Sequence, residues 1–101
     1  MAKFKAEKIS YIEQDRLIKK LGRVLTELKT DDAITNFLKD LLNRQERMML
    51  VRRLQIAELL AAGETYNAII EKLNCGPTTI ARIERWLNFG RGGFKKATKI
   101  T

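Results

Sequence analysis

Hydrophobic residues recur at helical spacing along most of the chain. One such stripe lies within residues 10–28, and a shorter one ends at Leu41. A third segment, residues 44–62, is apolar on more than one side, which is typical of a central helix or of one in a subunit interface. No segment alternates apolar and polar residues as a half-buried strand would. The pattern therefore predicts an all-α protein.

Residues 65–87 predict two short helices joined by a tight turn. Thr65 suits the N-cap of the first helix, and residues 74–76, Asn-Cys-Gly, suit the turn because Asn and Gly tolerate a left-handed backbone. Pro77 suits the first position of the second helix, where its missing N–H costs nothing. The apolar positions fall on one face of each helix: Ile69, Ile70, Leu73, Ile80, Ile83 and Leu87. This pattern is typical of a helix-turn-helix motif whose second helix, the reading helix, enters a major groove of DNA. The alternative is an ordinary corner between two helices.

Capping residues predict where the helices begin and end, and they indicate a domain of five helices. Thr30 or Asp31 caps the second helix, Asn43 opens the third with Glu46 in a capping box, and Gly63 ends it. We expect one domain in four parts: a mobile basic N-terminus (1–8), a helical dimerisation core (10–62), the helix-turn-helix (65–88) and a basic tail (89–101).

The first two predicted helices have too few partners within a chain of 101 residues. We therefore expect an interlocked homodimer in which they pack against the second subunit. Two reading helices about 34–36 Å apart would match successive major grooves.

Residues 89–101 contain four basic residues, no acidic residues and three glycines. This composition at a chain end favours a frayed tail. The alternative is a basic arm that follows a phosphate backbone.

The charge balance favours a polyanionic partner. Twenty Lys and Arg stand against twelve Asp and Glu, for a formal net charge of +8. With no signal core, no apolar run long enough to span a membrane and a single Cys, we expect a cytoplasmic protein without a membrane partner. With no His and one Cys, we predict no catalytic residues, no metal site, no cofactor and no enzymatic activity.

Residues 41–87, LLNRQERMMLVRRLQIAELLAAGETYNAIIEKLNCGPTTIARIERWL, resemble the tryptophan repressor superfamily. The matching frame is a Leu-Leu pair before the N-cap, then E-R, R-[LV]-x-I, E-L-L-x-x-G-E and a helix-turn-helix with T-I-x-R. The resemblance implies an interlocked, all-helical homodimer that binds operator DNA and represses transcription. It also implies a pocket for the co-repressor L-tryptophan between the third helix and the reading helix. There Arg53 and Arg82 would bracket the ligand, one gripping its carboxylate and the other stacking on its indole.

Three positions depart from the family's pocket. Asn43 replaces a Thr, Ile83 replaces a Gly, and Trp86 replaces a small Ser. We expect Ile83 and Trp86 to fill the pocket and to fix the reading helix without a ligand. The alternative is that Trp86 packs in the core beyond the motif. In either case we expect no tryptophan binding, and whether another small-molecule effector binds stays open. The family's last helix is expected to be missing or replaced by the basic tail.

Two sets of residues are candidates for contacts with double-stranded DNA. The first lies at the exposed start of the reading helix: Pro77, Thr78, Thr79, Ala81 and Arg82. The second contains phosphate candidates elsewhere, each Lys or Arg of which has the alternative of an ordinary solvated charge: Asn67, Lys72, Arg44 and Arg47. The first set includes no strong base-specific reader, so we expect modest specificity or specificity carried by DNA shape and water.

We therefore predict a dimeric DNA-binding transcriptional regulator, a repressor that acts without tryptophan. One alternative is a basic helical adaptor that binds a protein through the same two helices. Another is RNA binding, which Arg-Gly-Gly at residues 91–93 with Phe89 and Phe94 weakly indicates.

Overall fold

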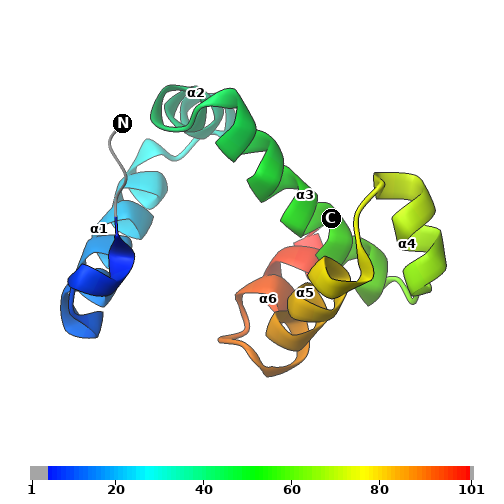
Figure 1. Cartoon of the computed structure of the whole chain (residues 1–101). Helices are drawn as coiled ribbons and strands as arrows, with labels where there is room; N and C mark the ends of the chain where they lie inside the picture. The colour runs from blue at the N-terminus through cyan, green and yellow to red at the C-terminus, as the bar shows by residue number, and fades with distance from the viewer. Residues whose placement is uncertain (1–4, 101) are drawn as a thin grey trace. The chain divides into compact units, whose positions relative to one another are not determined.

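A computed structural model of the chain describes residues 5–100 (Figure 1). Its elements are a 3₁₀ helix η1 (Ala6–Lys8) and the helices α1 (Tyr11–Leu28), α2 (Asp31–Leu41), α3 (Arg44–Ala61), α4 (Tyr66–Leu73), α5 (Pro77–Phe89) and α6 (Gly93–Ile100). No strand occurs in this part of the chain, which confirms the all-α prediction. Six α-helices replace the predicted five.

The chain divides into two compact units, and the division falls after Leu41. The predicted grouping of residues 10–62 as a dimerisation core therefore spans both units, and its role in dimerisation stays a prediction. The predicted mobile N-terminus falls partly on residues 1–4, which lie outside the described residues. Ala6–Lys8 form η1.

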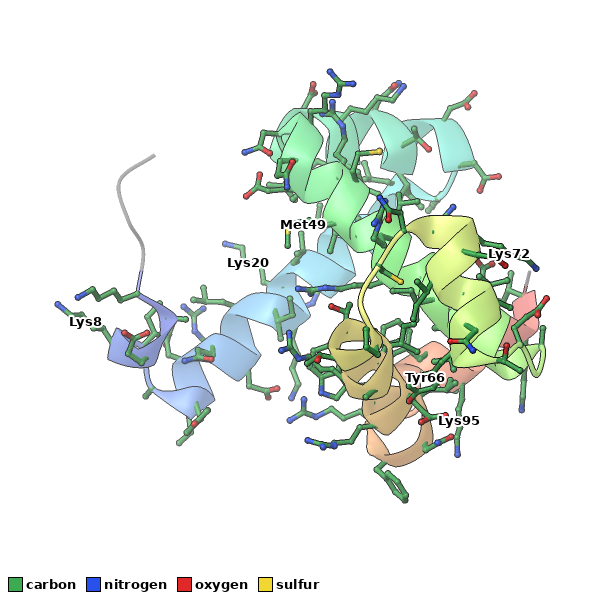
Figure 2. The ribbon with its side chains drawn as sticks, turned by 45° about the vertical axis from the view of Figure 1, so that its right-hand side comes forward. Lys8, Lys20, Met49, Tyr66, Lys72 and Lys95 are labelled. Carbon is green, nitrogen blue, oxygen red and sulfur yellow. The ribbon has the colours of Figure 1, made fainter. Side chains whose placement is uncertain are left out.

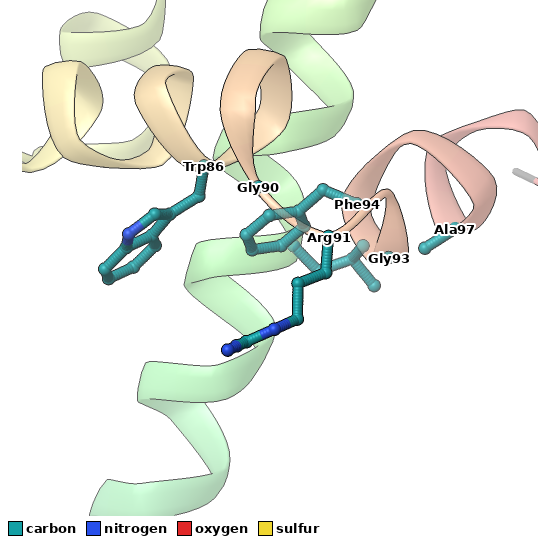
Figure 3. Close-up of a pocket in the computed structure, with 7 residues that line it drawn as sticks. Trp86, Gly90, Arg91, Gly93, Phe94 and Ala97 are labelled. Carbon is teal, nitrogen blue, oxygen red and sulfur yellow. The ribbon is translucent and has the colours of Figure 1, made fainter. Parts of the chain in front are cut away.

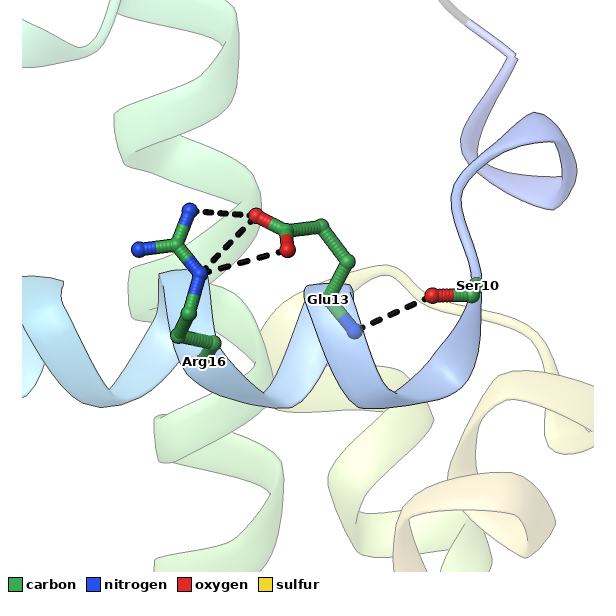
Figure 4. Close-up of polar contacts among 3 residues, drawn as sticks. All are labelled: Ser10, Glu13 and Arg16. Atoms are coloured by element: carbon green, nitrogen blue, oxygen red, sulfur yellow. Dashed lines mark hydrogen bonds and ion pairs between the residues drawn. The ribbon is translucent and has the colours of Figure 1, made fainter.

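The first unit contains α1 and α2, and capping side chains begin both helices. The Ser10 hydroxyl accepts the Glu13 N–H at 3.2 Å, and the Glu13 carboxylate in turn pairs with Arg16 (Figure 4). The Thr30 hydroxyl accepts the Ala33 N–H at 3.1 Å, so Thr30 acts as the cap of α2. Although α1 and α2 contact each other, no side chain from residue 5 to residue 41 is fully buried. The unit therefore has apolar stripes but no closed core.

The second unit is built around α3. Asn43 and Glu46 form the predicted capping box, each side chain accepting the other residue's backbone N–H at 2.9 Å. The C-terminal half of α3 packs against α4, α5 and α6 (Figure 1). The fully buried side chains of this core are Ile56, Ala57, Ile69, Ile80 and Ile83.

The N-terminal half of α3 has a different environment. Four consecutive apolar side chains, Met48 to Val51, are about half exposed in the single chain. The sequence predicted that α3 is apolar on more than one side, and the packing within this unit covers only one end of it.

The expectation of a frayed tail after residue 89 was wrong for residues 93–100, which form α6. Phe94 packs against the buried core, and α6 contacts both α3 and α5. The glycines build the turn that precedes this helix. Gly90 donates its N–H to the Trp86 carbonyl at 2.9 Å, and Gly92 adopts a left-handed backbone with φ of 87°. Glycine at these positions therefore reverses the chain and lets Phe94 reach the core.

Candidate nucleic-acid interface

α4 and α5 form a helix-turn-helix with the local signals that the sequence predicted. The Thr65 hydroxyl accepts the Ala68 N–H at 3.2 Å and caps α4. Asn74 ends α4 in the left-handed conformation, with φ of 52°, and its N–H bonds the Ile70 carbonyl at 2.8 Å. Pro77 is the first residue of α5. These residues make the turn short and hold the two helices next to each other.

The contact between α4 and α5 is apolar and closed. Ile69 of α4 and Ile80 and Ile83 of α5 are almost completely buried, and Ile56 of α3 lies in the same cluster. Because α3 packs against both helices, the inner face of α5 is buried and its outer face is exposed.

The exposed start of α5 carries the predicted DNA-contact residues. Every member of the first candidate set is exposed: Pro77, Thr78, Thr79, Ala81 and Arg82. Gly76 is the N-cap, and no side chain caps the helix, so the first-turn N–H groups at Thr78 and Thr79 are available to an anion.

Arg85 belongs to the same face, and the sequence reasoning missed it. It follows Ala81 by four residues and Thr78 by seven, so the three lie in one row along α5. Arg85 is exposed, and its side chain makes no hydrogen bond or ion pair within residues 5–100. Extending the helical period from Thr78 would have identified it.

The remaining phosphate candidates lie on two different helices, α3 and α4. Asn67 is exposed on α4, where Lys72 pairs with Glu64 at 2.7 Å (Figure 2). Arg44 and Arg47 lie in the first turn of α3, whereas the α3 residues that line a pocket beside α5 begin at Met49. The Arg47 guanidinium donates to the Leu42 carbonyl at 2.8 Å. Neither of these two arginines lines the pocket between α3 and α5.

A pocket of about 170 Å³ lies between α3 and α5. Its polar lining comes from Arg52 and Arg53 of α3 and from Thr79 and Arg82 of α5. Arg53 and Arg82 both line this pocket, as the resemblance implied, and neither guanidinium makes a hydrogen bond or ion pair within the described residues. Asn43 does not line this pocket. It caps α3 ten residues before Arg53, about 15 Å away along the helix.

Ile83 and Trp86 also line this pocket but have different surroundings. Ile83 is 1% exposed and belongs to the core, whereas Trp86 is 41% exposed. In the single chain the two side chains do not fill the pocket, because about 170 Å³ remains open beside them, and Trp86 does not join the buried core.

Trp86 separates this pocket from a second hollow of about 690 Å³. The second hollow lies between α3 and α6 and is mainly apolar, with Leu54, Phe94 and Ala97 in its lining (Figure 3). Arg91 lies at its edge. The indole therefore borders a small basic pocket and a larger apolar one.

One hydrogen bond crosses the helix-turn-helix. The Tyr66 hydroxyl donates to the Glu84 carboxylate at 2.7 Å, and both residues are partly buried. This bond, with burial and the negative charge of Glu84 as further causes, raises the pKa of Tyr66 above its ordinary value of 10.0. It also turns the carboxylate of Glu84 towards α4.

Two other kinds of site are absent from residues 5–100. No group of three or more His, Cys, Asp or Glu side chains there could hold a metal ion. None of the described helices has the length and apolar character needed to cross a membrane.

The packed α4–α5 pair, its tight turn and the exposed start of α5 define a helix-turn-helix protein. The chain belongs to the Trp repressor family, because the family described as Trp repressor protein matches residues 16–100. This is a regulatory DNA-binding family, not an enzymatic one. The match includes α6, so the expectation that the family's last helix is missing or replaced was wrong.

The chain is also similar to a protein of Bacillus subtilis (strain 168) named "Uncharacterized protein YerC". The two are 32% identical over 73 residues, which cover 72% of this chain and 70% of the relative. No solved structure matches the chain.

Proposed function

We propose that the protein is a homodimeric repressor that reads operator DNA through α5 and needs no tryptophan. The observation that carries this proposal is the exposed face of α5. It offers Thr78, Thr79, Ala81, Arg82 and Arg85 on a packed helix pair. The one acidic residue of α5, Glu84, bonds Tyr66 instead of facing outward.

The chemistry of this face suits a phosphate backbone beside a groove. The free N–H groups and hydroxyls of Thr78 and Thr79 can donate to phosphate oxygens. Arg82 and Arg85 can pair with phosphates or reach base edges, where Arg prefers guanine. Ala81 lies between them and fits against a thymine methyl group.

Unburied apolar surface in both units supports a homodimer. The first unit buries no side chain completely, although α1 carries a stripe of apolar residues, and it is too small to build an independent core. The second unit leaves Met48 to Val51 of α3 about half exposed. Apolar surface of this extent indicates a protein interface.

The pocket size supports independence from tryptophan. Typical pockets for organic ligands enclose about 300–1,000 Å³, and an engineered cavity of about 150 Å³ takes up benzene. The pocket beside Arg53 and Arg82 encloses about 170 Å³, which is small for an indole together with an amino-acid group. Ile83 and Trp86 are two of the side chains that bound this volume.

The first test is a selection of binding sites from random duplex DNA without added ligand, followed by a salt series on the enriched site. We expect an enriched, roughly palindromic sequence and a log–log slope of affinity against salt of about −0.9 per neutralised phosphate. No enrichment, with or without candidate amino acids, would contradict the proposal and favour a protein-binding adaptor. Preference for single-stranded RNA would favour the RNA-binding alternative.

Calorimetry tests the effector separately. We expect no saturable heat when L-tryptophan is titrated into the protein, alone or with its DNA site. Saturable micromolar binding would contradict tryptophan independence and leave the DNA-binding proposal intact.

A further inference from the structure

We propose that the hydrogen bond between Tyr66 and Glu84 sets the angle of α5 for DNA reading. These are positioning residues, and the inference rests on the proposed DNA-binding function. Tyr66 is the first residue of α4, and Glu84 lies in the middle of α5. Tyr66, labelled in Figure 2, lies at the end of α4 away from the turn of residues 74–76, so the bond joins the two helices opposite that turn.

The two connections close a triangle. One side is α4, the second is the part of α5 from residue 77 to residue 84, and the third is the Tyr66 side chain with its 2.7 Å hydrogen bond. The turn holds the two helices at one corner. A triangle whose sides are fixed has fixed angles, so the third side determines how steeply α5 crosses α4.

The dimensions show how sensitive this angle is. Along α5, residues 77–84 span about 10 Å, so a change of about 1 Å at Glu84 turns the helix by about 6°. The same turn moves Arg85 by about 1 Å, which exceeds the roughly 0.5 Å range of good N–H···O distances. Loss of the third side would therefore misplace Arg85 more than the residues close to the turn.

The apolar contacts between α4 and α5 set the crossing angle only approximately, because the angles of packed helices scatter by about 15–20°. Ile69, Ile80 and Ile83 keep the helices together, but the hydrophobic effect that buries them has no preferred direction. A hydrogen bond to a carboxylate is short and directional. The turn has its own support, because Arg52 of α3 donates to the Asn74 carbonyl at 3.3 Å.

The bond also fixes the orientation of the negatively charged Glu84 carboxylate. While Glu84 accepts from Tyr66, its carboxylate is held on the side of α5 that faces α4. Without the phenol this carboxylate could rotate towards the row of Ala81 and Arg85, where it would repel phosphates. Both effects of the bond favour DNA binding in the absence of a small ligand.

The test replaces Tyr66 by Phe and uses Tyr11→Phe as the matched control. Tyr11 is the chain's other tyrosine, is 88% exposed, and its hydroxyl makes no hydrogen bond within residues 5–100. We measure affinity for the enriched site and for random duplex DNA, well below the unfolding temperature. For Tyr66→Phe we expect about three- to tenfold weaker binding to the enriched site and a smaller change for random DNA, because only specific binding requires the α5 angle. Tyr11→Phe should change either affinity by less than about twofold.

Two further readouts separate positioning from a general loss of stability. Glu84→Gln keeps an acceptor for the phenol and should retain specific binding. Glu84→Ala should weaken specific binding through the lost positioning alone, because it also removes the carboxylate that could repel phosphates. Amide hydrogen exchange along α5 in DNA-free protein should speed up in Tyr66→Phe and Glu84→Ala while the protection of α3 stays unchanged.

An unchanged ratio of specific to random binding in Tyr66→Phe, with wild-type protein selecting a site, would overturn this inference alone. If wild-type protein selects no site, the proposed function fails, and the positioning role fails with it.

Discussion

Replacing Gly90 by Ala tests whether the turn before α6 is as tight as the structure indicates. A Cβ atom at Gly90 would lie 2.3 Å from the Trp86 carbonyl oxygen and 3.2 Å from its carbonyl carbon. Real Cβ contacts below 3.0 Å are essentially never seen. Because both atoms belong to the backbone of α5, no side-chain rotation can relieve the overlap. The end of α5 or the start of α6 has to move.

The expected cost has two contributions. Overpacking in a packed region costs about 1–3 kcal/mol. Movement of residue 90 also weakens its 2.9 Å hydrogen bond to the Trp86 carbonyl, which contributes about 0.5–1.5 kcal/mol. We therefore expect Gly90→Ala to lower the free energy of unfolding by about 2–4 kcal/mol, a large fraction of the stability of a small domain.

Urea unfolding measures this cost, and the fluorescence of Trp86, the chain's single tryptophan, reports on the affected region. Gly93→Ala is the matched control, because a Cβ atom there meets nothing within 4 Å and α6 already has a helical backbone at that residue. We expect the control to change the free energy of unfolding by less than about 1 kcal/mol. All variants are compared at the same protein concentration, because the stability of a dimer depends on concentration. Equal midpoints for Gly90→Ala and Gly93→Ala would refute the described turn.

Three further predictions concern the motif. Thr79→Asp should abolish specific DNA binding in a mobility-shift assay while the oligomeric state stays unchanged. Asn88→Asp adds the same charge near the other end of α5 and should leave DNA binding intact. Equal binding by both variants would mean that the reading face is misassigned. Ile80→Ala should cost about 2–5 kcal/mol in urea unfolding because Ile80 is completely buried, whereas exposed Ile100→Ala should cost little. Since its bond to Glu84 raises the pKa of Tyr66 above 10.0, the stabilisation from the neutral phenol is present below that pH and lost as the pH rises through the raised pKa. Wild-type protein should therefore lose stability above pH 10 more steeply than Tyr66→Phe, and equal slopes would contradict the assignment.

The helix-turn-helix could be predicted because its signals are local. A cap at Thr65, a left-handed residue at Asn74 and a proline at residue 77 each act within one helical turn, so neighbouring residues suffice to recognise them. The capping box at Asn43 is of the same kind. Such signals also placed the first three helices with their ends within about two residues.

Residues 89–101 show where local reasoning failed. Three glycines at a chain end are typical of a flexible tail, and the same glycines are what a tight turn requires. The difference depends on whether the segment after the turn finds a partner. Phe94 finds one on α3 and α5, and that contact makes residues 93–100 a docked helix.

The sequence by itself determined the all-α class, the helix-turn-helix and the exposed start of the reading helix, because helical period and capping are properties of neighbouring residues. The tertiary structure decided the features that require contacts between residues far apart in the sequence. It buried Ile83 and left Trp86 beside two hollows, although both lie on α5 three residues apart. It also joined Tyr66 to Glu84, eighteen residues away, and no periodicity in the chain indicates that bond. The physical reason is that such contacts form only when α3, α4 and α5 pack together, and that packing involves residues far apart in the sequence.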